Sequence, residues 1–166
     1  MLPFFNKQKT KTTVSTYNLK AFLSGKVISI ENVNDQVFSA KILGDGLAIE
    51  PESEIIVAPC DGVISTVMAD SKHAVGITTK NGMELLIHEG IDTVALNGEC
   101  FELFVKEGDN VKEGDKLIRF DAERIKSKGY QTTCILVVTN SDDFPNLKFY
   151  TGMDAVVGET VIVDVK

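Results

Sequence analysis

Short apolar runs rich in β-branched residues, separated by Gly, Asp and Asn, most strongly constrain what this chain can fold into. Such runs are typical of strands, and frequent turn residues between them are typical of all-β sandwiches and barrels. One or two helical turns are predicted over 122–128, where Gly129 is suited to end a helix. We therefore expect an all-β sandwich or barrel with very little helix, built from strands over 25–30, 47–49, 55–58, 62–68, 74–79, 84–88, 102–105, 116–120, 134–139 and 160–165.

The chain of 166 residues fits one domain with a substantial core. We expect a flexible N-terminal tail over residues 1–18 and a single domain over 19–166. The tail combines apolar residues with lysines (Leu2, Phe4, Phe5, Lys7, Lys9 and Lys11). It is either a loose tail or a short segment that touches an anionic membrane surface. No apolar run reaches the ~18 residues of a membrane span, and the tail is too short in its apolar part for a signal peptide.

Charge and cysteine content restrict the partners and the compartment. The formal net charge of -7 argues against nucleic acid as the main partner, because phosphate binding needs a basic patch. An acidic protein is better suited to meet a basic protein surface. The three cysteines are scattered along the chain without a C-x-x-C pair (Cys60, Cys100 and Cys134). They indicate reduced thiols and a cytoplasmic location rather than a disulfide framework.

The two histidines of the chain, His73 and His88, lie on either side of a predicted hairpin turn. Asn81-Gly82 between two apolar runs is a strong hairpin signal. If the flanking strands are antiparallel neighbours, residues whose numbers sum to about 162 face each other, so His88 faces about residue 74. The spacing therefore predicts that the two imidazoles lie side by side at one end of the ladder.

Two adjacent imidazoles have four readings. They can be structural, they can bind a metal together with a carboxylate, they can form a general acid/base pair, or one can be a nucleophile that the other supports. A neutral imidazole is a competent nucleophile near pH 7, and phosphoryl transfer to it needs mainly positioning and hydrogen-bond donors. His73 and the hydroxyl of Ser71 are suitable donors to phosphoryl oxygens. No G-x-x-x-x-G-K-[ST] motif is present, which argues against ATP or GTP as the phosphoryl source.

Four ordered blocks carry a family resemblance: VFSAKILGDGLAIEP at 37–51, then SKHAVGI, GMELLIHEGIDTV and VKEGDKLIRFD. From about residue 20 to its end, the chain resembles the glucose-type IIA component of the bacterial phosphoenolpyruvate-dependent sugar phosphotransferase system. The resemblance implies a flattened antiparallel β-sandwich. It also implies a phosphocarrier of the transferase class, which takes a phosphoryl group from the phosphohistidine of HPr and passes it to a cysteine of a IIB domain for coupled sugar uptake. No cofactor is required for this role.

The resemblance also assigns residues to roles. His88 matches the phosphorylated histidine, His73 the histidine that stabilises the phosphoryl group, and Ser71 a hydroxyl that hydrogen-bonds within the site. Zinc is implied as optional at the two histidines, with a partner supplying a carboxylate. The implied partner-binding surface has acidic residues at its rim and an apolar docking patch, formed by Asp35, Val37, Phe38, Ile42, Leu43, Leu86, Asp92 and Val94. Such a surface suits HPr and a IIB domain, and regulatory proteins that distinguish the phosphorylated from the dephosphorylated form.

Glu89 departs from the family pattern, which usually has an apolar residue directly after the phosphorylated histidine. Neighbouring residues of a strand point to opposite faces, so Glu89 points away from the phosphoryl group if the strand continues. If the strand ends at His88, the carboxylate can approach the ring, raise the pKa of His88 and repel phosphate.

Two other classes of function fit less well. A biotinyl- or lipoyl-carrier domain shares Gly-Asp turn hairpins but needs a modifiable lysine flanked by methionine, and the sequence has no Met-Lys-Met stretch. A zinc hydrolase using the two histidines lacks a third ligand at the usual spacing. A labile phosphate on histidine, a cofactor on lysine, or neither would distinguish the three classes by mass spectrometry.

Overall fold

The computed structural model describes residues 17–165. The predicted tail over 1–18 lies outside the described residues except for Tyr17 and Asn18. These two residues were assigned to the tail in error, because they begin strand β1 and pair with the C-terminal strand β14.

Strands are the main regular secondary structure of the described chain. They are β1 (Tyr17–Lys20), β2 (Gly25–Ser29), β3 (Asp45–Pro51), β4 (Ile55–Val57), β5 (Gly62–Val67), β6 (Ala74–Thr78), β7 (Glu84–Glu89), β8 (Phe101–Leu103), β9 (Asn110–Val111), β10 (Lys116–Phe120), β11 (Cys134–Val138), β12 (Lys148–Phe149), β13 (Asp154–Ala155) and β14 (Val161–Val165). The helices in the described part are α2 (Gln36–Ser39) and α3 (Ala122–Ser127), with short 3-10 turns η1 (Ile30–Asn32), η2 (Thr93–Leu96) and η3 (Ser141–Asp143).

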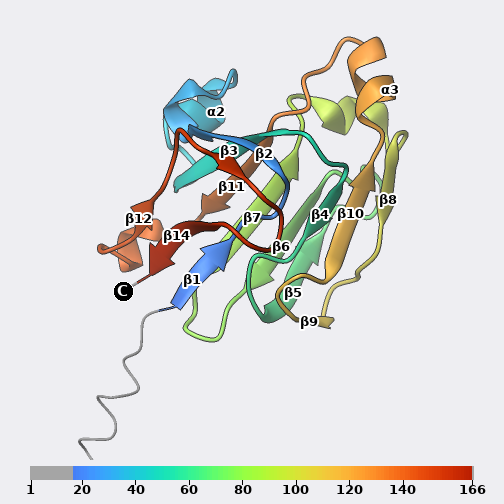
Figure 1. The fold of residues 1–166 in the computed structure, drawn as a ribbon. Helices are drawn as coiled ribbons and strands as arrows, with labels where there is room; N and C mark the ends of the chain where they lie inside the picture. The colour runs from blue at the N-terminus through green and yellow to red at the C-terminus, as the bar shows by residue number, and fades with distance from the viewer. Residues whose placement is uncertain (1–16, 166) are drawn as a thin grey trace, which may run out of the picture.

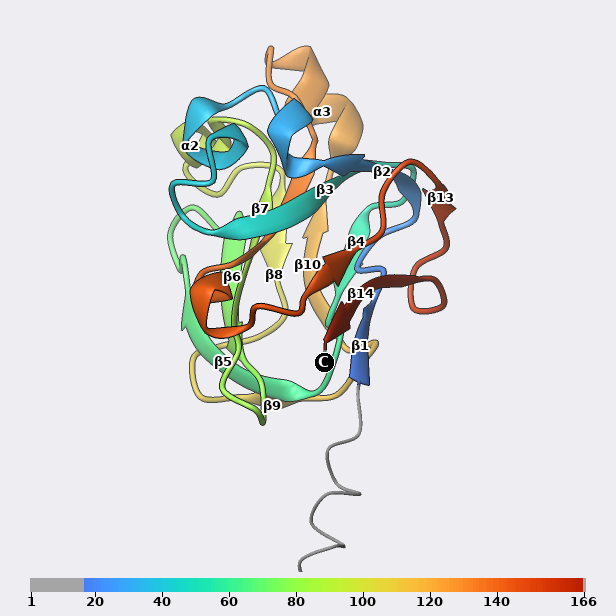
Figure 2. The same ribbon diagram turned by 90° about the vertical axis from the view of Figure 1, so that its left-hand side faces the viewer.

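The strands form three antiparallel sheets. An eight-stranded sheet has the order β13-β2-β3-β11-β7-β6-β5-β9, and two three-stranded sheets have the orders β1-β14-β12 and β4-β10-β8. Helices α2 and α3 lie at one end of the molecule, and β1 begins toward the other end (Figures 1 and 2). The predicted all-β antiparallel sandwich with very little helix is therefore confirmed.

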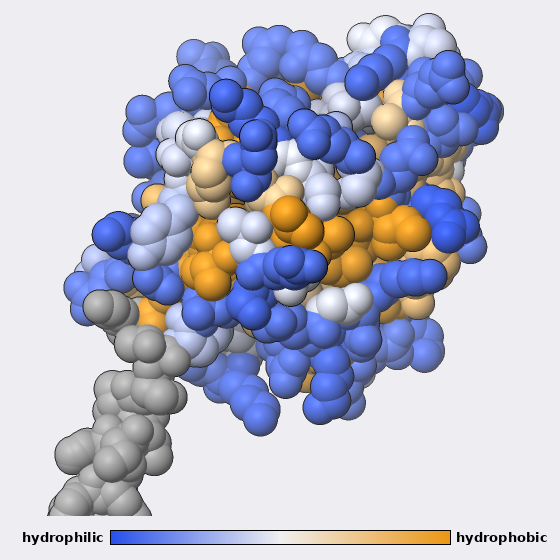
Figure 3. All heavy atoms as spheres, in the orientation of Figure 1, coloured by the Kyte–Doolittle hydropathy of each residue, from blue (hydrophilic) through white to orange (hydrophobic). Residues whose placement is uncertain are grey.

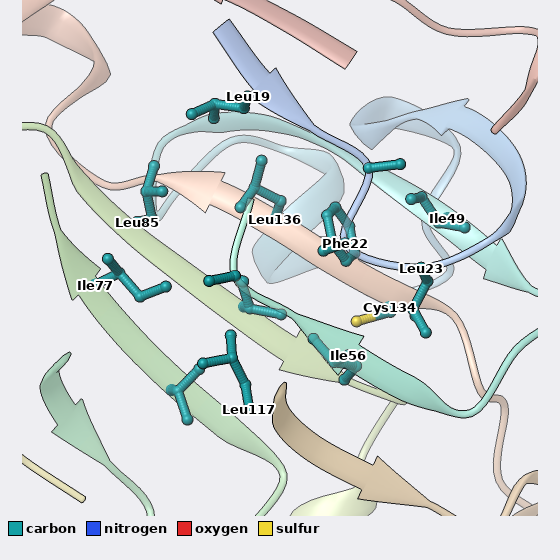
Figure 4. Close-up of a cluster of buried hydrophobic side chains, with 14 of the residues drawn as sticks. Leu19, Phe22, Leu23, Ile49, Ile56, Ile77, Leu85, Leu117, Cys134 and Leu136 are labelled. Carbon is teal, nitrogen blue, oxygen red and sulfur yellow. The ribbon is translucent and has the colours of Figure 1, made fainter. Parts of the chain in front are cut away.

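The main core lies on one face of the large sheet, where the alternate residues of β7 and β11 are fully buried (Figure 4). Leu85 and Ile87 of β7 point into it together with Leu136 of β11. Side chains of a strand alternate between its two faces, so Leu86 and His88 point to the opposite face of the sheet.

A second, smaller apolar cluster covers that opposite face. Ala48, Ile135 and Val137 of the large sheet pack there against Phe38 of α2 and Ile91 after β7. The chain between β2 and β3 folds over the sheet because this cluster removes its apolar side chains from water. This packing places α2 beside the last residues of β7.

All ten predicted strands are confirmed: nine have ends shifted by one or two residues, and 116–120 matches β10 without a shift. The predicted helix is α3. Gly129 follows it at positive φ, and the amide of Gly129 donates a hydrogen bond to the carbonyl of Lys126. The sequence analysis missed β1, β9, β12, β13 and α2. No helix among residues 17–165 has both the length and the apolar content that crossing a membrane requires. On the face that carries β1 and β14, apolar side chains form a band between hydrophilic areas (Figure 3).

Candidate functional site

The two histidines are brought together by the β6–β7 hairpin. Ala74 pairs with His88, and the other β6–β7 pairs also sum to 162, which confirms the predicted register. The imidazole rings of His73 and His88 are 4.6 Å apart between centroids and nearly perpendicular. The sequence-based expectation of two adjacent imidazoles at one end of this ladder is therefore confirmed.

His88 is half-buried and enclosed on its backbone side. The ring of Phe38 packs against it with the centroids 5.0 Å apart. Its Nδ1 atom is buried and has no partner that meets hydrogen-bond geometry among the described residues. Nε2 is therefore the nitrogen that remains for chemistry at the surface.

Burial and, to a smaller extent, the neighbouring His73 lower the pKa of His88 to about 4, against smaller raising effects from the backbone of Gly90 and from Asp35. The charged form of a buried base loses hydration, which favours the neutral ring. His88 is therefore neutral at physiological pH, and its unprotonated nitrogen carries a lone pair. This is the protonation state that a nucleophile requires.

His73 is oriented by Ser71. The Ser71 Oγ atom lies 2.8 Å from Nδ1 of His73, and both side chains are almost completely buried. Burial lowers the pKa of His73 as well. If the Ser71 hydroxyl donates to Nδ1, the neutral ring carries its proton on Nε2, where it can donate to a group bound at His88. Ser71 thus orients His73.

The two acidic residues of the predicted rim differ in their surroundings. Asp35 is the N-cap of α2, and its Oδ1 atom accepts a hydrogen bond of 3.0 Å from the amide of Val37. Asp92 is exposed, lies in the left-handed region with φ 61°, and makes no side-chain cap bond to η2. Asp35 therefore combines a structural role with its charge, whereas the carboxylate of Asp92 projects from a constrained turn.

The predicted apolar patch divides into exposed and buried members. Four members are well exposed large hydrophobic side chains: Val37, Ile42, Leu43 and Val94. Leu86 is half-buried and packs on the second apolar cluster. Phe38, which was also expected at the docking patch, is only 4% exposed. It lies beneath this surface because its ring is used to enclose His88.

Met68 belongs to the same face, and the sequence analysis missed it. Its amide bonds to the carbonyl of Ala74, so Met68 lies across from Ala74 just as His88 does on the other side. Residues directly opposite in antiparallel strands point to the same face. Met68 is 44% exposed. The register of β5 against β6 would have revealed it, but a bulge between Ile64 and Thr66 hides that register from the sequence.

Glu89 lies on the other side of the sheet from the site. Strand β7 continues through Glu89, whose side chain is 0% exposed in the main core. The alternative in which the strand ends at His88 and the carboxylate approaches its ring is wrong, because Glu89 pairs with Cys134 of β11. Burial raises the pKa of the Glu89 carboxyl well above its usual range.

The two imidazoles do not make a complete metal site within the described chain. No group of three or more His, Cys, Asp or Glu side chains among residues 17–165 is placed to hold a metal ion. Zinc in proteins is usually held by four ligands, or by three with water. His73 and His88 could supply two of these at most, so the described residues do not fit a resident metal.

The comparisons with known proteins agree with this geometry. A family model described as phosphoenolpyruvate-dependent sugar phosphotransferase system, EIIA 1, matches residues 17–144. A glucose-specific EIIA component of Bacillus anthracis is 44% identical over 156 residues, which cover 94% of this chain and 93% of the relative. Its counterpart in Haemophilus influenzae is 40% identical over 163 residues, covering 98% and 95%.

A solved structure is similar as well. The glucose permease IIA from Mycoplasma capricolum superposes with a TM-score of 0.80 at 34% identity, covering 92% of this chain and 97% of the other. Sequence, fold and the paired histidines thus lead to the same assignment. The chain belongs to the EIIA 1 family of the phosphoenolpyruvate-dependent sugar phosphotransferase system.

Proposed function

We propose that the protein is a phosphocarrier that accepts a phosphoryl group from phospho-HPr on Nε2 of His88. The lone pair of Nε2 attacks phosphorus, a new N–P bond forms, and the N–P bond of the donor phosphohistidine breaks with its electron pair returning to the donor ring. The phosphoryl group then passes in the same way to the thiolate of a cysteine in a IIB domain. The observation that carries this proposal is the half-buried His88, whose Nδ1 atom is enclosed and whose ring lies beside a second imidazole. Its lowered pKa of about 4 supports the proposal, because it leaves the ring neutral.

His73 stabilises the phosphoryl group in this proposal. Its ring stands nearly perpendicular to His88, and Ser71 holds its Nδ1 atom. A donor fixed before the reaction can stabilise charge on the transferring oxygens without reorganisation in the transition state. Ser71 acts as a positioning residue, because it keeps the proton of His73 on the nitrogen that faces the reaction.

The surroundings of His88 suit transient docking. Exposed apolar side chains such as Val37, Ile42 and Val94 give an apolar centre, and Asp35 and Asp92 add negative charge at its rim. Apolar contact excludes water, which protects a phosphohistidine from hydrolysis. The acidic rim steers basic faces of HPr and the IIB domain toward the site.

The sugar, the compartment and the regulatory partners belong to the same proposal. Both relatives compared are named as glucose-specific components, so glucose is the first sugar to test. A carrier that meets HPr would work in the cytoplasm. The phosphoryl group adds about two negative charges to the patch, so regulatory proteins would bind the dephosphorylated form. Zinc at His73 and His88 would need a carboxylate from such a partner.

The test is phosphoryl transfer with purified components. The protein is incubated with phosphoenolpyruvate, the first enzyme of the system and HPr, and intact mass and acid lability are measured. Wild type is expected to gain one acid-labile phosphoryl group, His73→Gln to gain it as well, and His88→Gln to gain none. Transfer onward to glucose is then measured with membranes that contain the IIB and membrane domains, where His73→Gln is expected to be slow. A wild-type protein that gains no phosphate from phospho-HPr contradicts the proposal.

A further inference from the structure

The turn directly after His88 is held by hydrogen bonds to both backbone polar groups of Glu89. The amide of Glu89 donates to the carbonyl of His73 at 2.7 Å, which links the backbones of the two histidine positions. The carbonyl of Glu89 accepts a hydrogen bond from the hydroxyl of Thr93. Thr93 is 0% exposed, so solvent does not compete with its hydroxyl for the Glu89 carbonyl. Glu89, the residue that follows His88, thus has both of its backbone polar groups hydrogen-bonded.

Thr93 also occupies the space beside Gly90. A Cβ atom at Gly90 would lie 2.3 Å from Cγ2 and 2.8 Å from Oγ1 of Thr93, and the φ of Gly90 is +86°. Only glycine fits this backbone conformation and this contact without strain. The amide of Gly90 bonds to the carbonyl of Thr133 at 2.9 Å. The Glu89–Gly90 peptide is therefore held at its N–H by the carbonyl of Thr133 and at its carbonyl by the hydroxyl of Thr93.

The carbonyl of Gly90, in the next peptide along the chain, lies near the imidazole of His88. Backbone interactions with Gly90 and with His88 itself raise the pKa of the ring, as nearby carbonyl oxygens do, but neither meets hydrogen-bond geometry at Nδ1. A residue's own carbonyl can reach only Nδ1, the ring nitrogen nearer the backbone, and Nδ1 is the buried atom that lacks a partner of good geometry. Hydrogen bonds of this kind are often loose in a free enzyme and tighten during reaction. The Gly90 carbonyl is thus the acceptor available to a proton on Nδ1.

We infer that Thr93 is a positioning residue for phosphoryl transfer: its buried hydroxyl fixes the Glu89–Gly90 turn so that the Gly90 carbonyl holds the His88 proton on Nδ1. The tautomer with the proton on Nδ1 leaves the lone pair on Nε2, the nitrogen at the surface. Outer hydrogen-bond partners set the tautomer of functional histidines in this manner. The inference rests on the proposed function for its consequence, while the effect on the tautomer is a property of the isolated protein.

The matched variants are Thr93→Val, which keeps the branched shape and loses the hydroxyl, and Thr93→Ser, which keeps the hydroxyl and loses the methyl group. Thr93→Ala is a second variant without the hydroxyl and relieves any crowding by the valine. The ring ¹⁵N chemical shifts of His88 are measured by two-bond ¹H–¹⁵N NMR in the full chain at neutral pH. The chain has two histidines, so a His73→Gln spectrum assigns the signals. Amide spectra of each variant check that it is folded.

We expect wild type and Thr93→Ser to show the tautomer protonated on Nδ1, and Thr93→Val and Thr93→Ala to show a mixture of tautomers. The rate of phosphoryl gain from phospho-HPr should fall about tenfold in both variants that lack the hydroxyl and recover in Thr93→Ser. An unchanged tautomer in a folded Thr93→Val or Thr93→Ala protein overturns the inference. So does a Thr93→Ser protein that shows the same mixture, because packing and not the hydroxyl would then be responsible. If wild type gains no phosphate while the tautomer responds as expected, the proposed function fails and the positioning role remains.

Discussion

The buried carboxyl of Glu89 makes a quantitative prediction about the pH dependence of stability. Glu89 is fully enclosed in the main core, and neither carboxyl oxygen has a hydrogen-bond partner of good geometry among the described residues. Burial is the largest cause of its raised pKa; the thiol of Cys134 acts in the opposite direction, and the charge of Glu50 raises the pKa further. Ionisation would place an unpaired charge in an apolar core, so the folded protein keeps Glu89 protonated.

The sign follows from proton linkage. In the unfolded chain Glu89 ionises near its ordinary pKa of about 4.3, whereas in the folded protein it stays protonated to a higher pH. Between these two pKa values the folded state binds one more proton, so the free energy of unfolding decreases as pH rises. The slope is about 1.4 kcal/mol per pH unit. The contribution of this residue to stability is complete below pH ~4.3 and is lost as the pH rises through the folded pKa.

The assay compares urea unfolding of wild type and Glu89→Gln at half-unit steps from pH 5 to pH 8. All other titrating groups are shared, so their effects largely cancel in the difference between the two free energies of unfolding. We expect this difference to grow in favour of Glu89→Gln by about 1.4 kcal/mol per unit and to level off at the folded pKa. Glu89→Val, which leaves no polar group in the core, should be more stable than wild type at pH 7. A difference that is flat from pH 5 to pH 8 would refute the reasoning, because Glu89 would then titrate alike in both states.

Two further predictions concern the site. Burial lowers the pKa of His88 to about 4, so an NMR titration should show that the ring stays neutral at pH values well below 6. The contribution of His88 to the free energy of unfolding should be lost as the pH falls from about 6.5 toward 4. A ring that titrates near pH 6.5 contradicts this prediction. Asp35 is both a helix cap and a charge beside the site, so Asp35→Asn should keep the cap and weaken the salt dependence of HPr binding, whereas Asp35→Ala should also cost about 1 kcal/mol of stability. Equal unfolding free energies for the two variants would rule out the capping role.

The hairpin that holds the histidines could be predicted because its information is local. Asn81-Gly82 fixes the turn, the turn fixes the register, and the register places His88 opposite Ala74. The resemblance of the four sequence blocks added a proposed role for each histidine, which spacing alone left open.

Other parts depend on contacts between distant segments and could not be predicted in this way. Helix α2 has only four residues, and it is held by the cap of Asp35 and by packing of Phe38 against the sheet rather than by its own periodicity. Strands β9, β12 and β13 have two residues each, too few to show alternation. The position of Phe38 also depends on distant contacts. It was expected at the docking patch, and nothing in the adjacent sequence indicates that its ring packs against His88.

Glu89 shows how strand parity reconciles the departure from the family pattern with the proposed chemistry. Parity alone puts residues 85, 87 and 89 on one face, and the structure places all three in the main core. The carboxyl and the proposed phosphoryl acceptor His88 are therefore on opposite faces of β7, although they belong to consecutive residues. Because burial also keeps the carboxyl protonated, Glu89 adds no negative charge that would repel a phosphoryl group at His88. The substitution of an apolar residue by Glu at this position thus affects the stability of the core, and phosphoryl acceptance by His88 should be preserved.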